Sequence, residues 1–266
     1  MNDSHDLLSR VTFAGNELDR LPYPEIRNTL KEHSIARITG LFNPDEVLSV
    51  RRTIENQFDS RNDRKHNPRD PEAIRGNLQK LQVGAVTPDY SSSVPRFLRM
   101  LFNPIFAEDI YGMRKLFIRL ARFRNLVYEL PVDFAVHGTD QELWTAARIH
   151  QYPRGGGFMA AHRDDVTAAV VKEAGLKLYL QAYLIMSKKG EDFKSGGAFI
   201  EYQGQGVDYE EACDVGDVLI YNERVIHGVA DIDPLEPLDL ATLSGRIAAF
   251  VTLFRHLKPL STESAR

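Results

Sequence analysis

Cysteine is nearly absent from the 266-residue chain, with Cys213 as its single example. An intrachain disulfide is therefore excluded, and this composition is typical of a reducing compartment, so we expect a cytoplasmic protein. The first six residues lack the positive start and the apolar core of a signal peptide. The longest apolar run, residues 178–186, contains Gln181 and is too short to cross a bilayer. We expect a soluble protein with no membrane partner.

An excess of charge of one sign is also absent. The chain has 33 Lys and Arg against 37 Asp and Glu, which gives a formal net charge of -4. Such a surface has no general attraction for nucleic acid, so we expect no nucleic-acid partner. The hydrophobic content of 43% is that of ordinary globular domains. Because no internal repeat or low-complexity segment divides the chain, we expect one domain over residues 1–266.

The first part of the chain has mainly helical patterns. Apolar residues at helical spacing predict a helix over 24–34. Asn43, a typical N-cap before a proline and two acids, predicts a helix over 44–58. The same start signal predicts a helical region over 103–128. Residues 59–76 have no apolar period and predict either a solvated loop or a lid over a functional site.

From Thr145 onward the pattern changes to strand spacing. Strands are predicted at 145–152, 158–164, 177–186, 197–203, 217–221, 225–229 and 246–254. Glycine and aspartate mark the turns between them. Helices followed by a run of short strands predict one α+β domain, in which a helical layer packs on a β-sandwich or barrel.

Only one of the eight histidines, His162, is followed two residues later by an acid, Asp164. In an extended chain these two side chains share one face. A third metal ligand downstream must be His227 or His256, and His227 is the better candidate because it lies within a predicted strand. Two histidines and one carboxylate form the facial triad that is diagnostic of non-haem Fe(II) oxygenases. A structural role explains each residue alone, but the three together favour a metal site.

Residues 148–254 resemble the Fe(II)/2-oxoglutarate-dependent dioxygenases, whose core is a double-stranded β-helix. The matching features are Tyr152, Gly155–Gly157, His162, Asp164, Gly196-Gly197, Gly216-Asp217, His227 and Gly245-Arg246, with residues 40–46 upstream. The resemblance implies an α+β fold with a double-stranded β-helix (jelly-roll, cupin-like) core and an N-terminal helical layer packed on the major sheet. Residues 1–144 would then be mainly helical support and lid, and residues 145–256 the β-helix core.

By this resemblance His162, Asp164 and His227 would bind Fe(II), and Arg246 would bind the distal carboxylate of the cosubstrate 2-oxoglutarate. A planar guanidinium holds a carboxylate through two parallel hydrogen bonds, which agrees with that role. The alternative for Arg246 is an ordinary salt bridge at a strand end.

Two features depart from the family pattern. Residues 231–244 lengthen the segment between His227 and Arg246, and Ala248 stands where the family has a serine. Both concern the way in which 2-oxoglutarate binds, and neither removes the guanidinium that would bind it.

Strand parity and closeness to the metal ligands in sequence give further candidates, for each of which a structural hydrogen bond is an equal alternative. The candidates for contact with the cosubstrate are Tyr152, His150 and Gln181, and those for contact with the substrate are Arg148, Arg163, Asp165 and Tyr183. On the strand 177–186, the face with Gln181 and Tyr183 is expected to look into the barrel, because the apolar face needs the helical layer to cover it.

The resemblance implies an enzyme, a non-haem Fe(II)- and 2-oxoglutarate-dependent dioxygenase that consumes O2 and releases succinate and CO2. We expect it to oxidise, in the first place to hydroxylate, an unactivated C–H bond. Asp164 argues against halogenation, because the related halogenases have a small residue at that position.

The substrate is expected to be a small polar molecule, such as an amino acid or a biosynthetic intermediate, because the chain has no accessory domain for recruiting a macromolecule. The oligomeric state is left open. Two alternatives remain: a divalent-metal hydrolase that uses the same triad, and a catalytically silent β-helix binding protein.

Overall fold

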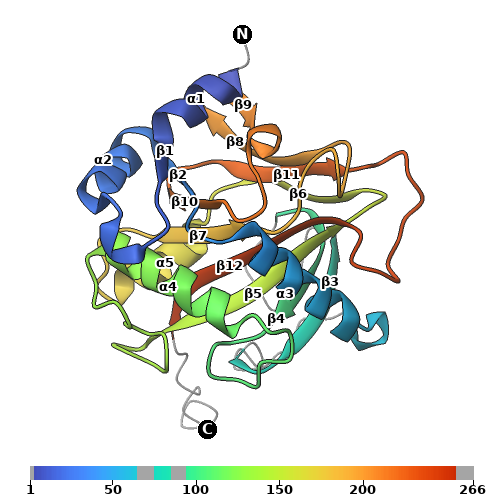
Figure 1. The fold of residues 1–266 in the computed structure, drawn as a ribbon, viewed down its shortest axis with the longest axis horizontal. Coiled ribbons are helices and arrows are strands. Elements are labelled where there is room, and N and C mark those ends of the chain that lie inside the picture. The colour runs from blue at the N-terminus through green and yellow to red at the C-terminus, as the bar shows by residue number, and fades with distance from the viewer. Residues whose placement is uncertain (1–2, 65–74, 85–93, 256–266) are drawn as a thin grey trace, which may run out of the picture.

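The computed structural model describes residues 3–64, 75–84 and 94–255, and two sheets face each other in it (Figure 1). The helices are α1 (Asp3–Val11), α2 (Tyr23–His33), α3 (Pro44–Gln57), α4 (Arg114–Tyr128) and α5 (Asp165–Glu173). Short 3-10 turns are η1 (Leu18–Arg20), η2 (Ser60–Asn62) and η4 (Glu210–Ala212). Within the described ranges, no helix combines the length and the apolar character that a membrane span requires.

The major sheet has the strand order β1-β2-β10-β7-β12-β5-β4, with β3 also paired to β4. Its strands are β1 (Thr12–Ala14), β2 (Ile35–Thr39), β3 (Leu78–Gly84), β4 (Arg96–Phe102), β5 (Leu143–Pro153), β7 (Leu180–Ile185), β10 (Val218–Asn222) and β12 (Gly245–Arg255). The minor sheet has the order β6-β11-β8-β9. Its strands are β6 (Gly157–His162), β8 (Gly197–Tyr202), β9 (Gln205–Asp208) and β11 (His227–Ile232). Because β4 pairs with both β5 and β6, it joins the two sheets along one side.

The major sheet lies between two hydrophobic cores, and β7 shows why. Leu180, Ala182 and Leu184 face outward and pack with residues of α2, α3 and α4. Gln181 and Tyr183 alternate with them and face the space between the sheets. The prediction that the polar face of this strand looks into the barrel, and that helices cover its apolar face, is therefore confirmed.

The helical region predicted over 103–128 is wrong in its first part, because the helix begins only at Arg114. Asn103 does not cap a helix: its Nδ2 donates to Asn77 Oδ1 at 2.8 Å and to the Glu108 carbonyl at 2.7 Å. Asp109 takes over the capping role, since its carboxylate accepts from the backbone N–H groups of Met113 and Arg114. The first N–H groups of a helix need an acceptor oxygen, and in α4 the Asp109 carboxylate provides it.

Other elements also differ from the sequence-based expectations. Strand β4 was not predicted, and it extends the sheet from the side expected to be helical. Helix α5 interrupts the stretch expected to be strands alone, because it begins directly after Asp164. Of the segment 59–76, residues 65–74 lie outside the described residues, so the lid stays a prediction.

The helix start at Asn43 is confirmed, and it allows a stability prediction. Asn43 Oδ1 accepts from the backbone N–H of Asp45 at 2.8 Å and from that of Glu46 at 3.4 Å. Asn43→Ala removes this acceptor, so we expect a loss of about 1 kcal/mol in the free energy of unfolding. Thermal or urea unfolding measures it, and Asn43→Asp, which keeps the acceptor, is the matched control. Equal losses in both variants would show that the cap hydrogen bond contributes nothing.

Candidate active site

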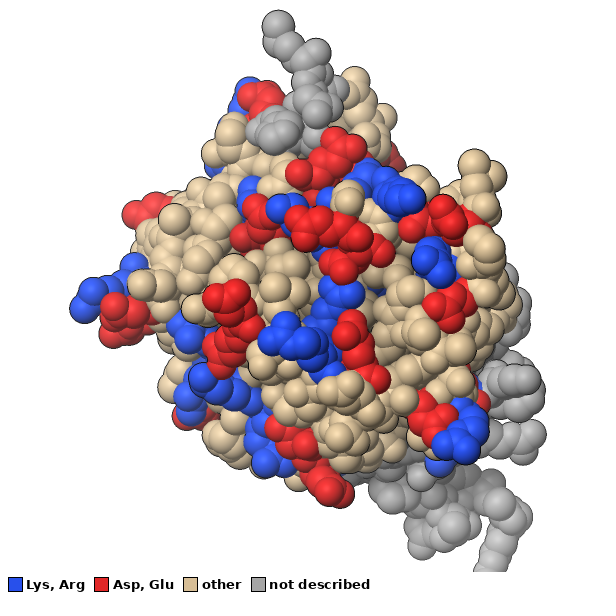
Figure 2. Space-filling model, turned by 45° about the vertical axis from the view of Figure 1, so that its right-hand side comes forward, with Lys and Arg blue, Asp and Glu red and all other residues tan. Residues whose placement is uncertain are grey.

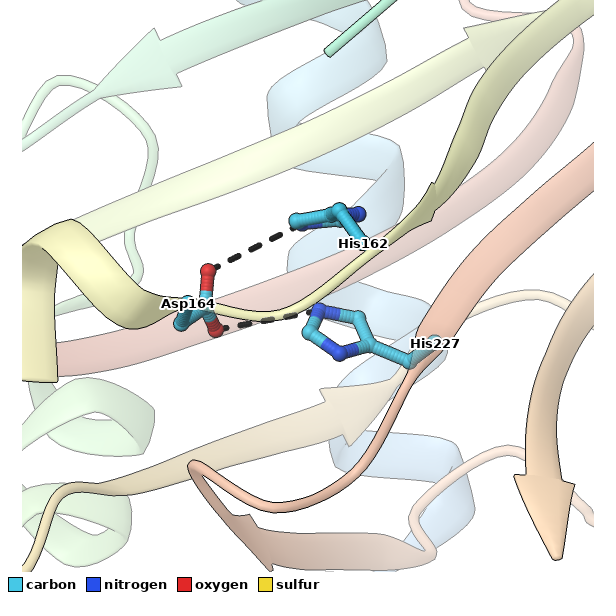
Figure 3. Close-up of side chains that lie close together, drawn as sticks. All are labelled: His162, Asp164 and His227. Carbon is cyan, nitrogen blue, oxygen red and sulfur yellow. Dashed lines mark ion pairs between the residues drawn. The ribbon is translucent and has the colours of Figure 1, made fainter. Parts of the chain in front are cut away.

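Three side chains converge at one end of the space between the sheets (Figure 3). His162 is the last residue of β6, and His227 is the first residue of β11, directly opposite it in the pairing of these strands. Asp164 follows β6 and precedes α5. Its Oδ1 lies 3.7 Å from His162 Nε2, and its Oδ2 lies 3.7 Å from His227 Nε2. One ligand atom from each residue lies within 4.8 Å of the other two, as a shared metal ion requires.

Backbone carbonyls orient both imidazole rings. His162 Nδ1 lies 2.9 Å from the carbonyl oxygen of Ala160, and His227 Nδ1 lies 3.2 Å from that of Val225. A carbonyl oxygen only accepts, so each Nδ1 carries the ring proton and donates it. The lone pairs of both Nε2 atoms therefore point toward Asp164, in the arrangement that metal-binding histidines have.

The protonation of His162 fits the same role. Burial, reinforced by the neighbouring His227 ring, lowers the pKa of His162 to about 4. His162 is therefore neutral near pH 7, and its Nε2 lone pair is available to a metal ion. Asp164 Oδ2 is buried without a hydrogen-bond donor among the described residues. A buried carboxylate oxygen without a donor is costly unless a cation compensates it.

The triad lies at the wall of a cavity between the sheets. Six of the side chains that the sequence suggested for cosubstrate or substrate contacts also line this cavity: Arg148, His150, Tyr152, Gln181, Tyr183 and Arg246. The other two do not. Arg163 and Asp165 are exposed and lie outside the lining, because the chain turns into α5 at this point and strand parity no longer applies. Closeness to the metal ligands in sequence did not bring them to the cavity.

Comparison of the sequence with protein-family models and with curated proteins finds no match. Solved structures do match. A prolyl-4-hydroxylase from Pseudomonas putida aligns over 88% of this chain and 98% of its own, with a TM-score of 0.53 and 14% identity. A 2OG-Fe(II) oxygenase family oxidoreductase from Burkholderia pseudomallei aligns over 93% and 96%, with a TM-score of 0.50 and 12% identity. A prolyl hydroxylase from Trichoplax adhaerens, in complex with a hypoxia inducible factor peptide fragment, aligns over 88% and 89%, with a TM-score of 0.54 and 12% identity.

This is the fold of the 2OG-Fe(II) oxygenases. The predicted double-stranded β-helix core is confirmed, with β5, β12, β7 and β10 in its major sheet and β6, β11, β8 and β9 in its minor sheet. The likeness at such low identity shows the fold alone. Any statement on the reaction must therefore come from the side chains of the site.

Arg246 enters the β-helix from the start of β12, opposite Tyr152 on β5, and is 2% exposed. Its Nε donates to Glu210 Oε1, and Glu210 is equally buried. The sequence did not predict Glu210 as the partner of Arg246. Glu210 lies on the short turn η4, where no strand or helix spacing indicates which way a side chain points. Arg246 thus makes a salt bridge, as the alternative reading expected, but the bridge lies inside the barrel rather than at its surface.

The salt bridge uses only one edge of the guanidinium. Arg246 Nη1 is buried without a hydrogen-bond acceptor among the described residues. A buried donor without an acceptor costs about 1–3 kcal/mol, so an acceptor supplied by a ligand would be stabilising there. The cavity therefore holds a triad suited to a divalent metal and, on the opposite sheet, an arginine donor suited to a carboxylate. These residues fit Fe(II) and 2-oxoglutarate.

Segment 231–244, which departs from the family pattern, does not displace Arg246. The carbonyl of Ile232 accepts from the backbone N–H groups of Gly155 and Gly156, so the segment packs against the glycine turn between β5 and β6. Gly155 has φ +89°, and a Cβ on it would lie 2.4 Å from the Leu238 backbone. The turn thus needs glycine in order to receive the longer segment, and β12 still begins opposite the end of β5.

Three aromatic residues of the cavity escaped the sequence analysis: Tyr209, Tyr221 and Phe250. Tyr221 packs on the His227 ring with centroids 4.6 Å apart, and Tyr209 hydrogen-bonds the Tyr183 hydroxyl. Burial raises the pKa of the Tyr209 and Tyr221 phenols, so both stay protonated as hydrogen-bond donors. Tyr221 and Phe250 lie on predicted strands, so the alternation of inward and outward residues could have predicted that they face the cavity. Tyr209 lies outside any strand, and no such alternation applies to it.

Proposed function

We propose that this protein is an Fe(II)- and 2-oxoglutarate-dependent dioxygenase that hydroxylates a C–H bond of a small polar molecule. In the balanced reaction, 2-oxoglutarate, O2 and R–H give succinate, CO2 and R–OH. The observation that carries the proposal is the presence, in one cavity, of the His162–Asp164–His227 triad and of the free Nη1 donor of Arg246. A two-histidine, one-carboxylate triad with open positions is the donor set of such oxygenases.

The side chains have distinct roles in this proposal. His162, Asp164 and His227 would hold the metal, which supplies the activation of O2 when bound. Arg246 would hold the distal carboxylate of 2-oxoglutarate, with Glu210 fixing the guanidinium through Nε. Arg246 and Glu210 are both 2% exposed, and a charged contact at such a buried position is stronger than it is in bulk water.

His150 offers one more donor. Its Nε2 accepts from Arg148 Nε at 3.0 Å, so the ring proton is on Nδ1, which is buried without a partner among the described residues. Burial and the charge of Arg148 hold the pKa of His150 well below its usual value, so the ring stays neutral. We therefore assign His150 a hydrogen-bonding role toward a bound ligand and not an acid–base role.

A metal hydrolase finds less support in the cavity. Such an enzyme needs a general base beside the metal to activate water. Besides Asp164, none of the residues that line the cavity is an acid. Glu210, the nearest buried acid, is bonded to Arg246 and to the Ala198 N–H.

The test is an anaerobic titration. Protein with Fe(II) and 2-oxoglutarate is expected to develop a weak visible charge-transfer band, because the keto acid would bind the metal directly. In air, the same mixture is expected to release succinate, more quickly when a substrate is present. Protein with Zn(II) in place of Fe(II) is the control, and neither the band nor succinate is expected from it. Absence of both signals with Fe(II) would contradict the proposed function.

A further inference from the structure

Many of the exposed lysines and arginines of this protein lie beside acids. On the face drawn in Figure 2, blue Lys and Arg lie among red Asp and Glu. Two of the ion pairs in the structure are Lys115 with Glu46 and Arg122 with Asp133. Two buried arginines also have an acidic partner: Arg99 pairs with Asp63, and Arg246 pairs with Glu210.

Arg148 differs from these arginines. It lines the cavity, is only 8% exposed, and has no acidic partner among the described residues. Its Nε donates to His150 Nε2 at 3.0 Å, and its Nη1 donates to Thr252 Oγ1 at 2.8 Å. Nη2 donates to no residue in the described part of the chain. Arg124 is also buried without an acid, but it does not line the cavity.

A guanidinium in this position is unfavourable without an anion. Burial lowers the pKa of Arg148, which records the cost of holding its charge away from water. The rings of Phe250 and Phe254 each lie 5.6 Å from its central carbon and offset part of that cost. A hydrogen-bonded anion would offset much more, because charge-assisted pairs in a dry site are the stronger interaction.

The cosubstrate assigned to Arg246 cannot be that anion as well. Arg246 lies opposite Tyr152 and Phe250 lies opposite Arg148, so the two arginines are four residues apart along β5 and β12. Four residues of a strand span roughly 13 Å. The five carbons of 2-oxoglutarate are joined by four bonds of about 1.5 Å, a contour of about 6 Å. The hydrogen bonds to His150 and Thr252 also hold the Arg148 guanidinium near its own level in the sheet, so it does not extend toward Arg246.

We propose that the substrate of this enzyme is a small carboxylic acid whose carboxylate is bound by Arg148. The proposal rests on the proposed function and names the substrate class for the same cavity. The edge formed by Nη1 and Nη2 matches the two oxygens of one carboxylate. With the carboxylate held at Arg148, the rest of the substrate would lie along the cavity toward the triad.

A second basic residue, Lys80, lies near Arg148 on a neighbouring strand. It is 4% exposed and lies opposite Met100, which in turn lies opposite His150, so Lys80 and His150 share the inner face of the sheet. Burial, followed by the charges of Arg148 and Arg96, lowers the pKa of Lys80 to about 8. The side chains of Lys80 and Arg148 thus place two basic groups on the same inner face of the sheet.

The experiment compares acids with their uncharged analogues. Straight-chain carboxylates from acetate to hexanoate, and their primary amides, are titrated calorimetrically into anaerobic protein saturated with Fe(II) and 2-oxoglutarate. Saturation with 2-oxoglutarate keeps the probes away from Arg246. We expect the tightest-binding acid to bind at least about tenfold more tightly than its amide. Arg148→Gln should abolish this preference, Arg148→Lys should retain part of it, and the exposed Arg52→Gln, which removes the same charge, should retain all of it.

Equal binding of acids and amides by the wild-type protein would overturn the assignment, and so would a preference that survives Arg148→Gln. The charge-transfer band separates this outcome from failure of the proposed function. If the wild-type protein has the band and no preference for acids, only the substrate class is wrong. If Arg148→Gln lacks the band because it does not fold, the wild-type comparison and Arg148→Lys still decide.

Discussion

Replacing Asp164 by Ala should abolish Fe(II)-dependent turnover of 2-oxoglutarate and weaken binding of divalent metal by more than about a hundredfold. Asp164 is the only anionic member of the triad, and both of its oxygens lie 3.7 Å from a histidine Nε2. Loss of a residue that merely orients a ligand already costs 10–100-fold in metal affinity, so loss of a ligand costs more. Anaerobic titration with Mn(II), followed by the electron spin resonance of the free ion, measures the affinity without turnover.

The adjacent Asp165 is the matched control for this experiment. It has the same carboxylate one residue further along, at the first position of α5, but it is exposed and outside the cavity. Asp165→Ala should bind Mn(II) as the wild-type protein does. If instead both variants bind Mn(II) normally, the metal does not bind at the triad, and the proposed function loses its main support.

The difference between Asp164 and Asp165 also shows what the sequence can predict. The period of a strand relates residues two apart, so His162 and Asp164 could be placed on one face without any structure. The third ligand, His227, followed because few histidines remain downstream. The same reasoning failed for Arg163 and Asp165, because a helix begins at that point and strand parity ends with β6.

Neither strand spacing nor helix spacing in the sequence could identify the partner of Arg246. Glu210 lies on the 3-10 turn η4, and its carboxylate reaches inward past Gly197 at the start of β8. A Cβ at position 197 would lie 2.7 Å from Glu210 Cγ, so only glycine leaves room for this side chain. The sequence showed Gly197 as part of a motif. Glycine is needed there because Glu210 packs against it, and only the folded chain brings these two segments together.

Strand β4 was missed for a related reason. Its sequence RFLRMLF does not alternate polar and apolar residues, so no strand period appears in it. Its pairing with β5 and β6 depends on residues distant in the chain. Burial of both faces does not by itself hide a strand, because β5, β7 and β10 are buried throughout and were predicted. What β4 lacks is a local pattern of polar and apolar residues.

Glu210→Gln should destabilise the protein by about 3–5 kcal/mol, because it leaves the Arg246 guanidinium buried without its counter-charge. Both side chains of this pair are at most 2% exposed, so water cannot replace the lost partner. Urea unfolding of the protein without ligands measures the change. The exposed pair Asp6–Arg10 provides the control: its N–O distance is 2.7 Å, yet Asp6→Asn should cost less than about 1 kcal/mol because solvent screens both charges.

A double variant separates the structural role of the Arg246–Glu210 pair from its role in binding 2-oxoglutarate. Replacing both residues by apolar ones, as in Arg246→Met/Glu210→Leu, removes the uncompensated charge and should restore most of the stability lost in Glu210→Gln. It should not restore the charge-transfer band, because the guanidinium proposed to hold the cosubstrate carboxylate is gone. In Glu210→Gln the guanidinium remains, so saturating 2-oxoglutarate and metal should stabilise this variant more than they stabilise the double variant. Recovery of the band in the double variant would show that 2-oxoglutarate is bound elsewhere, and continued instability would show that the pair stabilises the barrel by more than charge compensation.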